Sequence, residues 1–146
     1  MTQIGFTLSS EEFGPSELVR LASRAEEAGF DFLSISDHFH PWIDVQGHSP
    51  LVWATLGGVS QVTERVQVAT GVTCPTMRIH PVIIAQAAAT VAAMMPGRFI
   101  LGLGAGENLN EHIVGQGWPE PSVRHDRLEE AVGLIRRLWE GELTSH

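Results

Sequence analysis

The segment SDHFHPW, residues 36–42, places an acid, two histidines and a tryptophan directly after an apolar run. Histidine titrates near neutral pH, so His38 is a candidate general base, and a turn could bring Asp37 round to hold its ring. The alternate histidines His38 and His40 could instead open a metal site, because alternate strand residues face the same side. In a third interpretation Asp37 caps a loop and His38 is an ordinary polar residue. The segment itself leaves these interpretations open.

A second polar segment, GLGAGENLNEH, follows the apolar residues FIL. Its glycines resemble the glycine-rich turns of nucleotide and S-adenosylmethionine sites, although such turns normally follow the first strand of a domain and this one follows the fourth expected strand. Small residues let a flat ligand approach the backbone. Glu107 then stands at the expected pocket edge, where a carboxyl group is suited to proton donation. The later strand ends offer Cys74 and Glu107 but no second histidine pair, so we predict no metal site.

Four successive strand-and-helix units are expected to position these segments. Short runs rich in strand formers predict strands at residues 4–8, 32–36, 66–72 and 99–103. Prolines suit the first turn of a helix, and glycines or prolines end one. Helices are therefore expected from Pro15 to the stop at Gly29, from Ser49–Pro50 to about Val62, from His80–Pro81 to the stop at Pro96–Gly97, and from Ser122 to about Glu140. The last of these should bury Leu128, Ala131, Val132, Leu134, Ile135 and Leu138, and Trp53 and Trp139 should pack on helix faces.

Strictly alternating strands and helices predict a parallel sheet covered by helices. The polar segments all follow strands, and function in such folds collects at that edge. Two architectures compete, a doubly wound sheet and a (β/α)8 barrel, and the chain supplies four of the eight units that a barrel needs. The final residues WEGELTSH carry no terminating pattern. We therefore expect residues 1–146 to form a single partial domain, the N-terminal half of a truncated (β/α)8 TIM barrel.

Composition and charge narrow the classes of function. The net charge of −8 argues against nucleic-acid binding, which requires a basic face. The chain has no apolar run long enough to span a membrane, and its first residues show no secretion signal. A single cysteine, Cys74, excludes an internal disulfide and a paired-cysteine site. The absence of lysine excludes Schiff-base chemistry and a phosphate-loop lysine. We expect a cytoplasmic protein that acts on a small molecule.

Four segments in order and with matching gaps carry a resemblance that covers the chain from about Ile4 to its last residue. SDHFHPW, GVTCPTMRIHP, PGRFILGLGAGENLNEH and RLEEAVGLIRRLW resemble the luciferase-like barrel oxidoreductases that use the deazaflavin coenzyme F420. The subgroup is the one related to F420-dependent glucose-6-phosphate dehydrogenase, and the match covers the N-terminal half of its barrel. The resemblance implies hydride transfer between an alcohol or sugar-type substrate and the deazaflavin C5.

The resemblance also implies roles for individual residues. His38 would be the base that takes a proton from the substrate hydroxyl, Glu107 would be the acid near the coenzyme, and Trp42 would steady the substrate or the developing charge. Glu11 matches a position near the histidine. The cofactor-binding set would be Asp37, Gly71, Val72, Cys74, Ala105, Glu107 and Asn110, with Glu11 and Trp42 on the substrate side. A cis peptide bond is expected at Gly71–Val72.

The chain departs from this subgroup at three positions. Ala105 and Cys74 stand where the sugar-phosphate enzymes have threonines, and His40 replaces a glutamine. Their phosphate ligands lie outside the matched half, so a related alcohol fits as well as glucose 6-phosphate. Two other functions stay open: a flavin mononucleotide-dependent monooxygenase of the same fold, and a non-catalytic half-barrel. An isolated half-barrel exposes its strand edges and apolar interior, so we expect homodimers or other self-association.

Overall fold

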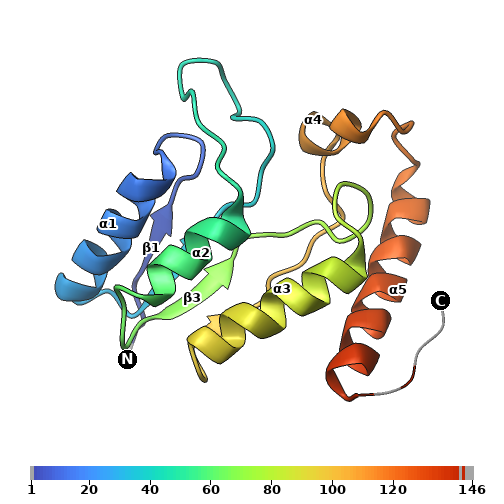
Figure 1. Cartoon of the computed structure of the whole chain (residues 1–146). Coiled ribbons are helices and arrows are strands. Elements are labelled where there is room, and N and C mark those ends of the chain that lie inside the picture. Colours follow the sequence, from blue (N-terminus) through green and yellow to red (C-terminus); the bar gives the residue numbers. More distant parts are fainter. Residues whose placement is uncertain (1, 142, 144–146) are drawn as a thin grey trace.

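The computed structural model describes residues 2–141 and 143. The elements are β1 (Gly5–Leu8), α1 (Pro15–Glu27), β2 (Phe32–Ile35), α2 (Val52–Ser60), β3 (Gln67–Thr70), α3 (Pro81–Met94), β4 (Phe99–Ile100), α4 (Asn108–Glu111), a 3₁₀ turn η1 (His112–Val114), and α5 (Pro121–Trp139). Figure 1 shows α1, α2, α3 and α5 following one another around the sheet in chain order. The end of the segment WEGELTSH lies outside the described residues.

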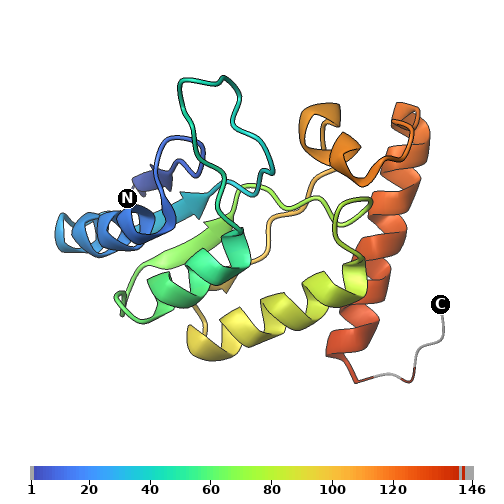
Figure 2. The same ribbon diagram turned by 45° about the horizontal axis from the view of Figure 1, so that its top comes forward.

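The sheet decides between the two expected architectures. Its strands are all parallel and lie in the order β1-β2-β3-β4, so each strand pairs only with its neighbours in the chain. Helix α1 packs on α2, α2 on α3 and α3 on α5, and these helices lie on one side of the sheet (Figures 1 and 2). A doubly wound sheet reverses its strand order and carries helices on both faces. The fold therefore consists of four consecutive strand–helix units, which is half of a TIM barrel.

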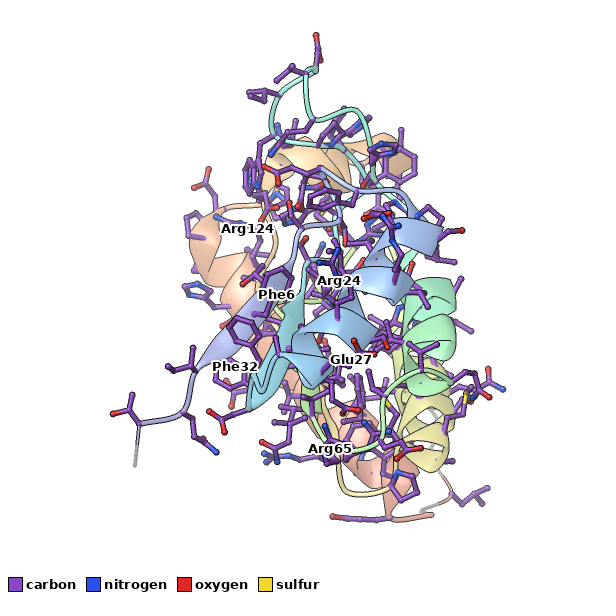
Figure 3. The ribbon with its side chains drawn as sticks, turned by 90° about the vertical axis from the view of Figure 1, so that its left-hand side faces the viewer. Phe6, Arg24, Glu27, Phe32, Arg65 and Arg124 are labelled. Carbon is purple, nitrogen blue, oxygen red and sulfur yellow. The ribbon has the colours of Figure 1, made fainter. Side chains whose placement is uncertain are left out.

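The two faces of the sheet differ in burial because only one of them meets helices. Leu8, Leu33, Ile35 and Val68 are fully buried in a core shared with α1, α2 and the end of α3. The opposite face carries Thr7, Ser34, Ala69 and Ile100 in register, and Ile100 is 48% exposed. The ring of Phe32, 36% exposed, lies over Gly5 at the β1 edge of this face, and Figure 3 views the sheet from this β1 edge. This face is the interior wall of the half-barrel.

Several element limits differ from the sequence prediction. Helix α2 begins at Val52 with Leu51 as its N-cap, and Ser49 does not cap it. The Ser49 hydroxyl donates instead to the carbonyl of His38, at 2.5 Å, because the preceding loop folds back onto the strand end. Strand β4 ends at Ile100, and the chain then makes only an isolated bridge from Leu103 to Thr73.

Helix α5 confirms its predicted stripe in part. Ala131, Leu134 and Ile135 are buried, whereas Leu128, Val132 and Leu138 are half-buried. Trp139 was expected to pack on a helix face but is 49% exposed, and its indole N–H donates to the carbonyl of Ala85. The ring of Trp139 therefore lies at the margin of the contact between α3 and α5.

No helix in the described ranges is both long and apolar enough to cross a membrane.

Two polar side chains, Glu26 and Arg98, anchor the end of the sheet at which the strands begin. The carboxylate of Glu26, at the end of α1, accepts backbone N–H groups of Glu64, Arg65 and Val66 at 2.7–3.2 Å. Burial alone would raise the pKa of Glu26, but these hydrogen bonds and the charge of Arg65 outweigh it and lower the pKa. Arg98 donates to the hydroxyl and carbonyl of Thr63 and to the carbonyl of Val66. These contacts fix the connections that enter β3 and β4.

Candidate active site

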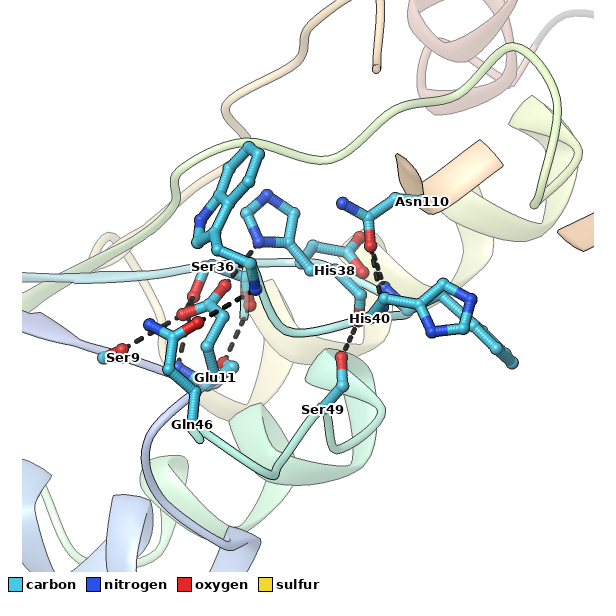
Figure 4. A network of polar contacts seen from close by, with 12 residues as sticks. Ser9, Glu11, Ser36, His38, His40, Gln46, Ser49 and Asn110 are labelled. Carbon is cyan, nitrogen blue, oxygen red and sulfur yellow. Dashed lines mark hydrogen bonds and ion pairs between the residues drawn. The ribbon is translucent and has the colours of Figure 1, made fainter. Parts of the chain in front are cut away.

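His38 lies just beyond β2, and Glu11, from the loop after β1, holds its ring. The Nδ1 atom of His38 contacts Oε1 of Glu11, and the other carboxylate oxygen accepts hydroxyl hydrogen bonds from Ser36 at 2.9 Å and Ser9 at 3.1 Å. Figure 4 shows this network converging on the Glu11 carboxylate. Parallel neighbouring strands place their following loops side by side, which is why residues so far apart in sequence meet here. Asp37 does not hold the ring, contrary to the possibility raised from its position in the sequence.

The charge on Glu11 fixes which nitrogen of His38 is available. Burial alone would raise the pKa of Glu11, but hydrogen bonds from its own backbone N–H and from Ser36, together with the charge of His38, lower it. An ionised carboxylate can only accept, so Nδ1 of His38 carries the hydrogen in this contact. We therefore assign the lone pair of the neutral imidazole to Nε2, which faces away from Glu11.

The Nε2 atom of His38 meets a second carboxylate. Oε1 of Glu107, the N-cap residue of α4, lies 3.2 Å from Nε2. A hydrogen bond between these atoms requires one proton, on either the imidazole or the carboxyl group. The side chain of Glu107 is 41% exposed and that of His38 is 14% exposed. Trp42 stands edge-on to His38 with ring centroids 5.0 Å apart. The arrangement places an imidazole and a carboxyl group side by side at the surface.

Asn110 ties α4 to the loop that carries His38. Its Oδ1 accepts the backbone N–H groups of Phe39 and His40 at 2.6 and 2.8 Å, and its Nδ2 donates to Glu107 at 2.8 Å. Asn110 is 1% exposed, so these three hydrogen bonds are made inside the protein. The residue therefore holds Glu107 and the His38 loop in one arrangement.

A buried group of charges lies behind the histidine, and sequence reasoning missed two of its members, Arg78 and Glu111. Arg78 Nη2 donates to Oδ1 and to the carbonyl of Asp37, at 2.9 and 3.2 Å, and the hydroxyl of Thr73 donates to Oδ2 of Asp37 at 2.7 Å. Glu111 accepts the backbone N–H of Arg78 at 2.9 Å. Burial raises the pKa of Glu111, and Arg78 offsets part of that effect. The segments TMRIHP and NLNEH contain these residues, but no local pattern distinguishes them from surface charges.

The loop after β3 forms an exposed ledge beside this network. The peptide bond Gly71–Val72 is cis, as expected, and Val72 is 47% exposed. Gly104 comes from the neighbouring β4 end, where a Cβ atom would lie 2.6 Å from the Val72 side chain. Glycine at this position therefore lets the two strand ends meet.

Cys74 lies beneath the glycine turn and is 5% exposed. Burial raises the pKa of its thiol, and Sγ lies 3.2 Å from the hydroxyl of Thr76. Ala105, on the turn itself, is half-buried.

The predicted site residues fall into two groups by accessibility. The residues that reach the surface are His38, Trp42, Gly71, Val72, Ala105 and Glu107, whereas Glu11, Asp37, Cys74 and Asn110 are buried. The accessible group combines an apolar ledge with a base and an acid, which suits a flat, partly apolar ring system that exchanges protons. Deazaflavin and flavin rings both have this character.

Other features do not coincide with the site. A cavity of about 600 Å³ lies between the start of α1 and the loop before α2, and none of its lining residues belongs to the predicted site. Among residues 2–141 and 143, no group of three or more His, Cys, Asp or Glu side chains is arranged to hold a metal ion.

Known proteins resemble this chain over nearly its whole length. The sequence model of the luciferase-like monooxygenase family matches residues 1–146. The F420-dependent glucose-6-phosphate dehydrogenase of Nakamurella multipartita is 51% identical over 140 residues, which cover 96% of this chain and 41% of that protein. The enzyme of the same name from Tsukamurella paurometabola is 49% identical over 145 residues, which cover 98% of this chain and 43% of that protein.

A solved structure shows the same likeness in three dimensions. An F420-dependent secondary alcohol dehydrogenase, in complex with an F420-acetone adduct, superposes with a TM-score of 0.91 at 45% identity, covering 95% of this chain and 42% of that protein. The chain thus spans about two fifths of the length of the proteins it matches. It belongs to the luciferase-like family, in the part related to F420-dependent dehydrogenases.

Proposed function

We propose that this chain carries the proton-transfer face of an F420-dependent dehydrogenase that acts on an alcohol. The observation that supports this function best is the line of three side chains, Glu11, His38 and Glu107, across one imidazole ring. An alcohol oxidation releases a proton from the hydroxyl and a hydride from the carbon that bears it. The coenzyme, when bound, supplies a hydride acceptor at C5 of its deazaflavin ring.

His38 takes the hydroxyl proton at Nε2, since Glu11 occupies Nδ1. As the imidazole gains positive charge, the adjacent ionised carboxylate of Glu11 stabilises it without moving. This effect is strongest in the low dielectric of a partly buried site, and Glu11 is 4% exposed. Glu107, 3.2 Å from Nε2, is positioned as the acid that passes a proton between this ring and the bound ligands. The edge of Trp42 closes one side of the same space and limits the approach of water.

The coenzyme ring would lie against the ledge of Gly71, Val72 and Ala105, because these are the accessible apolar residues beside the acid and the base. Asp37, Cys74 and Asn110 would support that ledge and its neighbouring loop from behind, and contact a ligand through backbone atoms or not at all. The relatives' names support F420, and a flavin ring makes the same demands on the ledge. The alcohol is a small secondary alcohol or a sugar-type alcohol.

Titration of the chain with oxidised F420, and separately with FMN, tests this function. Tryptophan fluorescence is the first readout, since Trp42 stands 5.0 Å from His38. We expect saturable quenching by F420, weaker quenching by FMN, and loss of affinity in His38→Ala and Glu107→Ala. His125→Ala, an exposed histidine on α5, serves as the matched control and should bind as the wild type does. A folded wild-type chain that binds neither ring would refute the proposal for this chain.

We also propose that the chain associates with itself and works in the cytoplasm. The uncovered sheet face carries Phe32 and Ile100, and β1 and β4 each have an unpaired edge within the described sheet. The solitary cysteine agrees with a reducing compartment, where disulfides do not persist.

A further inference from the structure

We propose that Arg78 is a positioning residue that docks α4 against the loop after β2, and thereby sets the distance between Glu107 and His38. Its effect on catalysis, though not its effect on α4, rests on the function proposed above. Arg78 lies on the loop between β3 and α3. Its ion pairs and hydrogen bonds go to Asp37 on one side and Glu111 on the other, and through these two residues it acts on His38 and Glu107.

The contacts of Arg78 join three strand ends. Nη2 binds Asp37, which follows β2; Nε lies 3.7 Å from Oε1 of Glu111, which belongs to α4; and the backbone N–H of Arg78 donates to the same carboxylate at 2.9 Å. The side chains of Asp37 and Glu111 are 1% and 2% exposed and that of Arg78 is 9% exposed. Two buried carboxylates would repel each other across this gap without the guanidinium between them.

Glu111 is the residue next to Asn110 in α4, so a contact on one bears directly on the other. Asn110 holds the backbone of Phe39 and His40 and also the side chain of Glu107. A four-residue helix has little stability of its own, because nucleating a helix costs more than its few hydrogen bonds return. Side chains that anchor α4 therefore decide where Glu107 stands.

The planar guanidinium matters as well as its charge. Its nitrogens point in fixed, divergent directions, so it can face Asp37 and Glu111 at the same time. A lysine ammonium is a single point of charge and can approach only one of the two carboxylates closely. Arg78→Lys thus keeps the charge and the backbone hydrogen bond to Glu111 but removes the side-chain bridge between the two carboxylates, which separates positioning from simple charge balance.

Amide hydrogen exchange measures the docking in the free chain. In Arg78→Lys, we expect the exchange protection of the Phe39 and His40 amides, whose acceptor Asn110 lies on α4, to decrease. This decrease should be about ten times the decrease at amides in the middle of β2, as expected for losing one contact to a charged group. Asp37→Asn, which weakens the same bridge from its other end, should show the same local loss and serves if the lysine variant folds poorly. The matched control is Arg98→Lys, which alters a half-buried, hydrogen-bonded arginine at the other end of the strands and should affect all these amides alike.

Titration with F420 then links docking to function. Arg78→Lys should weaken F420 binding about tenfold while Arg98→Lys leaves it unchanged, because only the first displaces Glu107. If Arg78→Lys lowers protection equally at Phe39, His40 and β2, or leaves it unchanged, Arg78 is a structural residue only and the inference is overturned. If the wild-type chain binds no F420 but the local loss at Phe39 and His40 is observed, the docking role stands and the proposed function fails.

Discussion

Replacing Glu11 by glutamine tests whether an ionised carboxylate organises the site. The substitution keeps the shape of the side chain but removes the charge that Ser9, Ser36 and His38 contact. A hydrogen bond to a charged group contributes about 1.5–3 kcal/mol and one between neutral groups about 0.5–1.5 kcal/mol, so three bonds lose about 3 kcal/mol together. The neutral amide avoids part of the cost of burying a charge, which offsets the loss. We expect the variant to lose about 1–2 kcal/mol of unfolding free energy at pH 7.

The lowered pKa of Glu11 determines how the stability difference between wild type and Glu11→Gln changes with pH. The pKa of Glu11 is lowered from its ordinary value of 4.5 in the folded chain. A carboxyl group with a depressed folded pKa stabilises the fold fully above its ordinary pKa, and this contribution is lost as the pH falls through the folded value. The difference in stability between wild type and Glu11→Gln should therefore be constant above pH 4.5 and shrink below it.

Urea unfolding followed by tryptophan fluorescence, from neutral pH to about pH 3, measures this difference. Glu12→Gln is the matched control, since Glu12 is the exposed neighbour of Glu11 and should unfold as the wild type does. Two results would refute the hypothesis that an ionised Glu11 organises the site. One is equal stability of Glu11→Gln and wild type at pH 7, and the other is a stability difference that does not shrink as the pH is lowered. In an F420-binding preparation, the same variant should slow alcohol oxidation by about 5–30-fold, which corresponds to the same 1–2 kcal/mol.

Three further predictions concern the fold. Glu26→Gln should lower the unfolding free energy by about 2 kcal/mol, because an ionised acceptor of three backbone N–H groups is lost, while F420 affinity stays unchanged; loss of affinity in a folded variant would contradict the separation of this anchor from the site. Gly106→Ala should lower the unfolding free energy by more than about 2 kcal/mol, since φ is +75° and a Cβ would lie 2.6 Å from Sγ of Cys74. Gly115→Ala, at φ +73° with nothing within 4 Å of the new Cβ, should cost only about 1 kcal/mol. Equal melting temperatures for the two variants would contradict the predicted clash at Gly106. Light scattering at micromolar concentration should show dimers or larger species, and a monodisperse monomer would refute self-association.

The sequence predicted the order of elements well because the signals are local. Apolar runs, proline at the starts of α1 and α3, and glycine or proline after their ends lie within a few residues of what they specify. The polar strand ends came together at one edge, as a parallel sheet requires. Ser49 misled the prediction because its hydroxyl serves a carbonyl eleven residues away instead of the helix beside it. Local pattern and tertiary contact differed there, and the contact determined the helix start.

The partners within the site could not be read from spacing. Glu11 was placed near His38 only through the family resemblance, since 27 residues separate them. Arg78 and Asp37 are 41 residues apart, and Arg78 and Glu111 are 33 apart. Such pairs depend on which loops meet when the strands align, and a charged residue in a loop looks the same in sequence whether it is buried or exposed. Burial and pairing in these cases are properties of the assembled edge.

The polar networks at the two edges of the sheet share no residue. Glu26 and Arg98 hold the edge where strands enter, and Glu11, His38 and Glu107 occupy the edge where they leave. A four-residue strand separates them by roughly 13 Å. Substitutions that far apart, with no common partner, change stability additively. Stabilising substitutions near Glu26 and Arg98 and activity-changing substitutions near His38 could therefore be selected in separate libraries. The selected substitutions could then be combined without testing every pair.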